Sequence, residues 1–168
     1  MCTTNGFAAS KVETLDVSRA RWHGYTNAVE LDEVIAEMYA CICFEEGQRP
    51  DWSRQAAIFA PAARMVRVTD DGIDEFDLES YRANLEAMID SGAMPSFWEG
   101  EIWRDTQQFG EIAHVLSAYE TRRSRNGEAQ NRGVNSIQLF KRGDRWSISA
   151  MLWRREGRTV RIPDTSRP

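Results

Sequence analysis

The sequence predicts a single α+β domain in which helices come first and antiparallel strands follow. Apolar residues recur at helical spacing before Pro95, whereas they alternate with polar residues after it. The chain has 168 residues, of which 42% are hydrophobic, so it is long enough to bury one core without disulfides or metals. The chain has three cysteines. Cys41 and Cys43 would point to different faces of a helix, so neither a disulfide nor a metal site is expected.

Two helices are expected near the N-terminus. The first begins at Asn27, a suitable N-cap that forms a capping-box pattern with Glu30, and it ends before Gly47. Its apolar face comprises Leu31, Val34, Ile35, Met38 and Ile42. The second helix lies in "DWSRQAAIFA", between Pro50 and Pro61.

A strand and a third helix follow. The stretch "ARMVRV" has the composition of a strand, and the polar stretch "TDDGIDEF" is expected to form a loop. Asp77 can then cap a helix that Gly92 ends. The apolar face of this helix comprises Leu78, Tyr81, Leu85, Met88 and Ile89.

Four long strands with a period of two complete the chain. They are "SFWEGEIWRDTQQ", "EIAHVLSAYETRR", "GVNSIQLFK" and "RWSISAMLWRRE". Tight turns are expected at Phe109-Gly110 and Gly143-Asp144, and a loop containing Asn126-Gly127 joins the middle two strands. The four strands are therefore expected to be antiparallel neighbours.

The last hairpin suggests which strand faces are buried. A two-residue turn at Gly143-Asp144 pairs Leu139 with Ile148, Ile137 with Ala150, and Asn135 with Leu152. We expect this face to pack beneath the helices, together with Trp146. The opposite face carries a mixture typical of a subunit interface, namely Ser136, Gln138, Phe140, Ser147, Ser149, Met151 and Trp153. A homodimer formed through the C-terminal strands is therefore expected.

The preceding hairpin brings the only candidate catalytic pair together. The turn at Phe109-Gly110 pairs Asp105 with His114, Trp103 with Leu116, and Glu101 with Ala118. We expect His114 to be a buried or interfacial residue that is hydrogen-bonded to Asp105. The catalytic alternative assigns proton transfer to His114 with Asp105 or Glu101. The opposite face, expected under the helices, comprises Trp98, Ile102, Ala113, Val115 and Tyr119.

Several segments resemble those of a known family. They are "FEEGQRPDWSRQAAIFAPAARMVRV", "AHVLSAYETRR" and "RGVNSIQLFKRGDRWSISAMLWRRE". The residues that carry the resemblance are Phe59, Pro61, Ala63, Arg145, Trp146, Ile148 and Trp153. Over residues 27–156 the chain resembles the nuclear transport factor 2-like superfamily and, within it, uncharacterised bacterial SnoaL-like proteins. Residues 1–26 would then be an N-terminal extension and residues 157–168 a C-terminal tail.

The resemblance implies a cone-shaped (cystatin-like) α+β fold, in which three N-terminal helices pack on a strongly curved, mainly antiparallel sheet around a pocket. It also implies a homodimer formed through the outer face of the sheet. Ketosteroid isomerases, polyketide cyclases, dehydratases and pure binding domains share this fold, so the function must be argued from the site.

The expected function is a dimeric domain that holds a small apolar or aromatic ligand in the pocket of the cone. The candidate pocket residues are Tyr39, Trp98, Tyr119 and Asn135. One alternative is a metal-free isomerase, cyclase or dehydratase that uses the histidine–carboxylate pair. The other is a protein-association module that binds no ligand. No cofactor is expected.

Charge and hydropathy limit which partners and which cellular location can be expected. Residues 1–119 carry 9 Lys and Arg against 21 Asp and Glu, whereas residues 120–168 carry 12 against 5. The basic residues of "TRRSRNGEAQNR" are expected to lie at strand ends rather than to bind a nucleic acid. The chain has neither a long apolar run nor the apolar core of a signal peptide, so a cytoplasmic protein with no membrane partner is expected.

Overall fold

The computed structural model describes residues 28–162 and confirms the α+β class. The elements are α1 (Ala28–Cys41), α2 (Trp52–Ile58), β1 (Phe59–Val68), β2 (Ile73–Phe76), α3 (Leu78–Asp90), β3 (Trp98–Phe109), β4 (Ile112–Arg122), β5 (Asn131–Arg142) and β6 (Arg145–Arg155). The predicted N-terminal extension and the Asn27 cap lie outside the described residues, as does the tail beyond residue 162. The stretch predicted as a loop contains β2, a short strand at the sheet edge that its polar composition hides.

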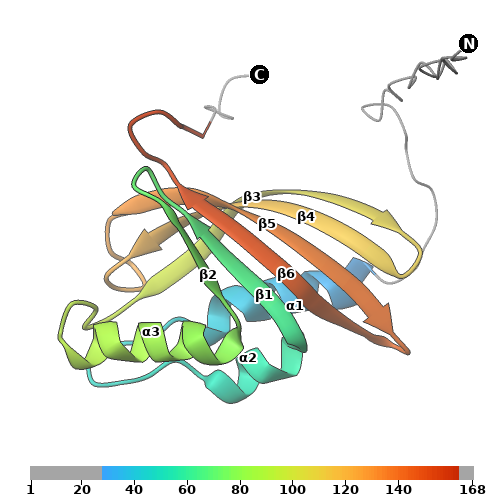
Figure 1. Ribbon diagram of the computed structural model, residues 1–168, viewed down its shortest axis with the longest axis horizontal. Helices are drawn as coiled ribbons and strands as arrows, with labels where there is room; N and C mark the ends of the chain where they lie inside the picture. The colour runs from blue at the N-terminus through green and yellow to red at the C-terminus, as the bar shows by residue number, and fades with distance from the viewer. Residues whose placement is uncertain (1–27, 163–168) are drawn as a thin grey trace, which may run out of the picture.

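All six strands form one sheet in the order β2-β1-β6-β5-β4-β3. Every neighbouring pair is antiparallel except β1 and β6, which run parallel. The sheet is therefore mainly antiparallel, as predicted. Figure 1 shows the long, bent strands β3 to β6 passing in front of α1, while α3 and α2 lie at the lower end beneath β1 and β2.

Local sequence determines where α3 begins and ends. The Asp77 carboxylate accepts a hydrogen bond from the Ser80 amide at 2.8 Å, and the Ser80 hydroxyl accepts one from the Asp77 amide at 3.0 Å. This reciprocal arrangement is a capping box, which satisfies amides that the first turn leaves free. Gly92 follows the last turn with a φ of +74°, a conformation that glycine adopts at little cost. Both predicted ends of this helix are therefore confirmed.

A continuous apolar core joins α1 to one end of the sheet. Val115, Ile137 and Ile148 have no exposed surface, and Trp146 retains only 3%. They pack with Leu31, Ile35 and other residues of α1. The prediction that Trp146 and Ile148 lie beneath the helices is confirmed.

The predicted pairing of β5 with β6 is correct only near the turn. Leu139 pairs with Ile148, but a bulge at Ser149 shifts the register, so that Ile137 pairs with Met151 and Asn135 with Trp153. A bulge places one extra residue on one strand and thereby reverses the faces beyond it. Consequently Met151 and Trp153 lie on the concave face, and Leu152 is 44% exposed on the convex one. Their predicted faces were wrong.

The predicted pairing of β3 with β4 is also wrong. The turn consists of Gly110-Glu111, with Gly110 at a φ of +55°, one residue later than expected. His114 therefore lies opposite Gln107, and Asp105 lies opposite Leu116.

A bulge at Ile102 then changes the faces at the far end of β3. Beyond it Glu101 pairs with Tyr119, not with Ala118, and Ile102 is exposed, contrary to prediction. The predicted burial of Ala113, Val115 and Tyr119 is confirmed, whereas Trp98 is only half-buried.

None of the helices between residues 28 and 162 is both long enough and apolar enough to span a bilayer. In the same part of the chain no three His, Cys, Asp or Glu side chains gather in a way that could hold a metal ion.

Candidate functional site

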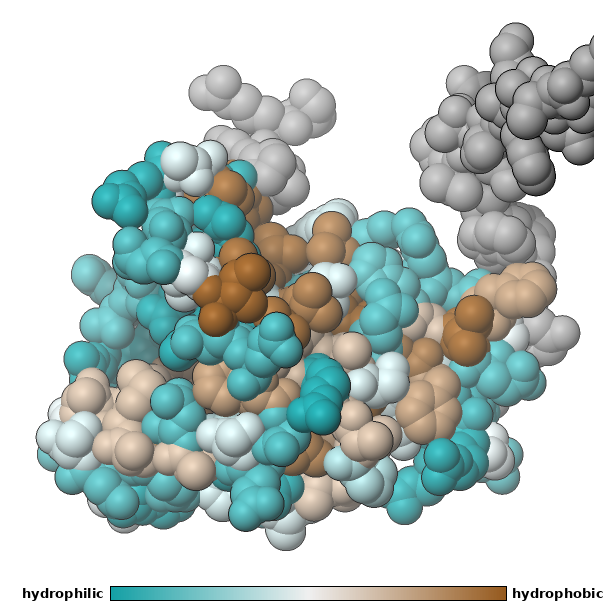
Figure 2. Space-filling model, in the orientation of Figure 1, coloured by the Kyte–Doolittle hydropathy of each residue, from teal (hydrophilic) through white to brown (hydrophobic). Residues whose placement is uncertain are grey.

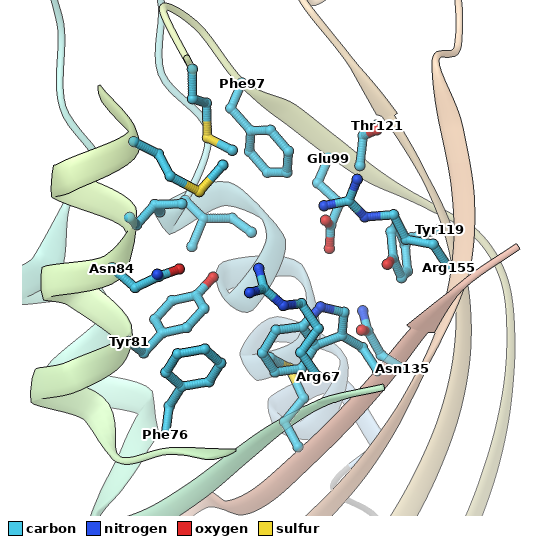
Figure 3. Close-up of a pocket in the computed structure, with 16 residues that line it drawn as sticks. Arg67, Phe76, Tyr81, Asn84, Phe97, Glu99, Tyr119, Thr121, Asn135 and Arg155 are labelled. Atoms are coloured by element: carbon cyan, nitrogen blue, oxygen red, sulfur yellow. The ribbon is translucent and has the colours of Figure 1, made fainter. Parts of the chain in front are cut away.

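A cavity of about 70 Å³ lies between α3 and the concave face of the sheet, at the end away from the apolar core. All six strands and α3 contribute to its walls. Figure 3 shows the labelled polar side chains that surround it, which are Arg67, Tyr81, Asn84, Glu99, Tyr119, Thr121, Asn135 and Arg155. Apolar side chains, among them Phe76, Phe97 and Trp153, complete the lining.

The two bulges build this cavity. Because of the bulge at Ser149, the inward series of β6 becomes Met151, Trp153 and Arg155. Because of the bulge at Ile102, Glu99 lies opposite Thr121 and faces inward. Without these extra residues the strand alternation would direct these side chains to the convex face.

The position of Glu99 is fixed by the chain that follows α1. Phe44 and Phe97 form an isolated antiparallel bridge, with amide-to-carbonyl distances of 2.9 and 3.0 Å. Two residues later the Glu99 amide donates to the Sγ of Cys43 at 3.3 Å. Both contacts join the start of β3 to the chain after α1, so they hold the Glu99 backbone against the helix layer.

The Glu99 side chain lines the cavity and is half-buried by its walls. Burial raises its pKa to about 8, although a hydrogen bond from Asn135 and the charge of Arg155 oppose the rise. At neutral pH this group is therefore mostly a neutral carboxylic acid. A neutral acid can donate a hydrogen bond, which a carboxylate cannot do.

Aromatic rings form one wall of the cavity. The Tyr81 ring meets Phe76 and Trp153 edge-on, each at a centroid separation of 6.0 Å. Phe76 and Trp153 stack at 6.2 Å. Burial raises the pKa of the Tyr81 and Tyr119 hydroxyls, so both keep their protons at any ordinary pH.

Tyr119 is held in place by a glycine on the neighbouring strand. Gly133 lies directly opposite Tyr119 in the register of β4 and β5. A Cβ atom at Gly133 would lie 2.5 Å from the Tyr119 hydroxyl oxygen and 2.7 Å from the carbonyl oxygen of Arg154. The ring therefore occupies the space that any other residue would fill.

A hydrogen-bonded chain runs from the cavity wall into the protein. Asn135 Nδ2 donates to the Tyr39 hydroxyl at 3.1 Å, and the Tyr39 hydroxyl lies 2.6 Å from Ser117 Oγ. Ser117 Oγ in turn donates to Glu101 at 2.5 Å, and Glu101 pairs with Arg104 at 3.3 Å. Asn135, Tyr39 and Ser117 are all buried, so this chain fixes the amide that contacts Glu99.

The predicted pocket residues are divided between the cavity and its surroundings. Tyr119 and Asn135 line it. Tyr39 stands one hydrogen bond behind Asn135. Trp98 does not line it; the guanidinium of Arg125 lies 5.6 Å from its ring instead.

The predicted catalytic residues are not brought together. His114 lies on the convex face with its Nε2 3.0 Å from Ser136 Oγ, and Asp105 is exposed opposite Leu116. The expected Asp105–His114 pair is wrong because the turn falls one residue later than predicted. Glu101 lies on the concave side but is bonded to Ser117 and Arg104.

Sequence reasoning missed the residues that dominate the cavity, which are Arg67, Tyr81, Glu99 and Arg155. Tyr81 was assigned to a packing face, and it does pack there, but its hydroxyl points into the cavity in Figure 3. Glu99 and Arg155 lie beyond the bulges, where strand alternation counted from the turns gives the wrong face. One sequence feature could have pointed to Glu99. It lies two residues before Glu101 in a strand that is otherwise rich in aromatic residues.

No protein-family model matches the chain, and no curated protein matches it in sequence. Solved structures, however, share its fold. One is a protein of unknown function with a cystatin-like fold from Nostoc punctiforme PCC 73102, with a TM-score of 0.58 and 16% identity over 76% of this chain and 90% of that one. The fold is that of the NTF2-like proteins.

Two further neighbours agree with this fold. An NTF2-like protein of unknown function from Silicibacter pomeroyi DSS-3 has a TM-score of 0.54 and 16% identity, covering 76% of this chain and 94% of its own. LinA has a TM-score of 0.57 and 9% identity, covering 77% of this chain and 85% of its own. At identities this low, structural similarity establishes a common fold only. The function must therefore be argued from the cavity.

Proposed function

We propose that this protein binds a small, largely apolar or aromatic molecule in the cavity, and that the carboxylic acid of Glu99 donates a hydrogen bond to an oxygen of that molecule. The observation that carries the proposal is a carboxyl group that burial keeps neutral, set among aromatic side chains in a concave site. Ligand sites typically combine an apolar lining with a few convergent polar groups.

The dimensions of the cavity favour a small ligand. Its volume of about 70 Å³ is enclosed on one side by α3, where Met88 contributes a flexible side chain, and by Met94 in the loop that follows this helix. Methionine adapts readily to the shape of a partner. We therefore expect a ligand of about one ring, with some adjustment of α3 on binding.

The pKa of Glu99 also favours a second candidate function, which is proton transfer by a metal-free isomerase, cyclase or dehydratase. A group with a pKa of about 8 exchanges protons efficiently near neutral pH. In its ionised form Glu99 would take a proton from one carbon of the ligand and return it to another. The Tyr81 hydroxyl would donate a hydrogen bond to the oxygen that gains charge. Glu99 here takes the role that the sequence assigned to His114.

Titration calorimetry with acetophenone, a small aromatic ketone, tests the binding proposal. Glu99→Leu removes the donor and should weaken binding about tenfold, whereas Glu99→Gln keeps an N–H donor and should bind nearly as well. Glu75→Gln, on the exposed edge strand β2, is the matched control and should bind as the wild type does. Equal binding by Glu99→Leu and the wild type would refute the role of Glu99.

Proton transfer is tested separately by proton NMR of cyclohex-2-enone in D2O. The wild type should catalyse exchange of the protons next to the carbonyl, and Glu99→Gln should lose this exchange while retaining binding. Exchange that survives in Glu99→Gln would exclude Glu99 as the acid–base group.

We also propose that the protein is a homodimer formed through the convex face of the sheet. Exposed apolar side chains on this face are Trp103, Phe109, Ile112 and Leu152. Figure 2 shows hydrophobic residues gathered in the middle of the strands in view, with hydrophilic residues around them. Light scattering should give a dimeric mass that Leu152→Arg reduces to that of a monomer; a monomeric wild type would refute the proposal.

A further inference from the structure

Two guanidinium groups stand at the open end of the cavity. Arg67 of β1 lies beside Trp153 of β6 in the parallel register, and Arg155 follows Trp153 on the same face. In Figure 3 both side chains point toward the centre of the cavity. The two arginines therefore face one space from neighbouring strands.

Only one of these two positive charges has a carboxylate partner among the described residues. Arg67 uses its Nε to donate to Asp74 at 2.9 Å, and this ion pair leaves both terminal nitrogens available. Arg155 forms no ion pair with any residue between 28 and 162. By contrast, Arg154, the next residue on β6, pairs with Asp70 at 2.8 Å. The nearest carboxyl group in the cavity, that of Glu99, is mostly neutral at pH 7.

The arginines also connect the cavity to a groove on the surface. A groove of about 320 Å³ is lined by Arg67, Trp153 and Arg155 together with Asp70, Glu156 and Gly157. An anion entering through this groove would meet the two arginines before it reached the aromatic wall. The acidic residues of the groove would repel a group with two negative charges more strongly than a group with one.

We propose that the ligand of this cavity is a small organic carboxylate, whose anionic group is held by Arg67 and Arg155 while its apolar body contacts the ring of Trp153. This inference rests on the proposed function and specifies its ligand class. The planar guanidinium group matches a carboxylate through two parallel hydrogen bonds. Arg67 lies on the same strand face as Trp153, so an aromatic acid can engage both at once.

The geometry also relates the carboxylate to Glu99. Arg155 and Glu99 line the same cavity, and in Figure 3 both side chains point toward its centre. A carboxylate held by Arg155 therefore brings the atoms next to it within reach of Glu99. The neutral acid would donate to the ligand rather than repel it.

Titration calorimetry with benzoate and benzamide, two probes of the same shape and different charge, tests the inference on the full-length protein. The wild type should bind benzoate at least tenfold more tightly than benzamide, and 0.5 M NaCl should reduce this preference. Arg155→Gln should lower the affinity for benzoate about tenfold and leave that for benzamide unchanged. Arg142→Gln, at the turn end of β5 and away from the cavity and the groove, changes the net charge equally and should leave both affinities unchanged.

The outcomes separate this inference from the proposed function. Equal binding of benzoate and benzamide by the wild type would overturn the carboxylate assignment and leave cavity binding intact. Displacement of benzoate by equimolar inorganic phosphate would also overturn it, in favour of a phosphate ligand. Failure of benzoate, benzamide and acetophenone to bind at millimolar concentration would overturn both proposals. Equal loss in Arg142→Gln and Arg155→Gln would assign the effect to net charge and refute the site.

Discussion

The concave face of the sheet differs between its two ends, although the same strands form both. Near the turns, Val115, Ile137 and Ile148 pack against α1 with no exposed surface. Farther along, the same strands present Tyr119, Asn135 and Arg155 to a cavity under α3. The packed end supplies apolar burial, which stabilises the fold, and the open end holds polar groups that burial penalises.

The bulge at Ser149 marks the border between these ends. On the turn side, Ile148 faces the core; beyond it, the inward positions pass to Met151, Trp153 and Arg155. A single extra residue thus allows one strand to serve the core and the site. We infer that stability and function are separable along each hairpin, and the following substitutions test that separation.

The largest effect is expected at the packed end, from Trp146→Ala. Trp146 is 3% exposed within the core, and removing its ring should cost about 3–5 kcal/mol of unfolding free energy. Urea denaturation measures this loss. A cost below about 1 kcal/mol, the level of surface changes, would show that this end is not the stabilising one.

Gly133→Ala should have the next largest effect, at the open end. The added methyl group would collide with the Tyr119 ring and with a backbone oxygen, so we expect a loss of about 1–3 kcal/mol and weaker binding of acetophenone. Gly100→Ala is the matched control, because nothing lies within 4 Å of its added Cβ and its φ is not positive. Equal effects of the two substitutions on stability and binding would mean that Tyr119 does not occupy this space in solution.

The pH dependence of stability should reveal Glu99. Because its pKa is raised from 4.5 to about 8 in the folded protein, the folded state binds the proton more tightly than the unfolded state does. Its contribution to stability is therefore complete below pH 4.5 and is lost as the pH rises to about 8. Glu99→Gln should remove a decline of about 2 kcal/mol across this range, a figure reduced for partial access of solvent. Parallel pH profiles for the variant and the wild type would contradict this account.

The smallest effect is expected on the convex face, from His114→Asn. His114 makes one hydrogen bond to Ser136 and lies outside the cavity, so the loss of stability should be about 1 kcal/mol or less. The affinity for acetophenone should not change. A stable variant that no longer binds would restore the catalytic hypothesis for this histidine.

Much of the fold was predictable because local signals determine it. The Asp77 cap, the Gly92 terminus and the turn at Gly143-Asp144 are each encoded within a few residues, and all three appear in the structure. The parallel pairing of β1 with β6 was not predicted because it joins distant segments of the chain, and the edge strand β2 was missed because its composition is polar.

The site was less predictable because it depends on register. Strand alternation identifies faces only as far as the next bulge, and the bulges at Ile102 and Ser149 leave no mark in the sequence pattern. Tyr119 and Asn135 lie at positions that strand alternation assigns correctly to the inward face of the sheet. Both could therefore be named in advance. Glu99 could not, since its burial results from closure of the cavity by α3 and the bend of the sheet.

The account depends most directly on the protonation state of Glu99 inside the cavity. Carbon-13 NMR of protein labelled at the glutamate carboxyl carbons measures it, and the Glu99→Gln variant identifies the resonance. We predict a titration midpoint of about 8 for this carboxyl group. A midpoint near 4.5, the ordinary value for this side chain, would show that the carboxyl group is solvated and ionised at neutral pH, and would contradict the proposed site.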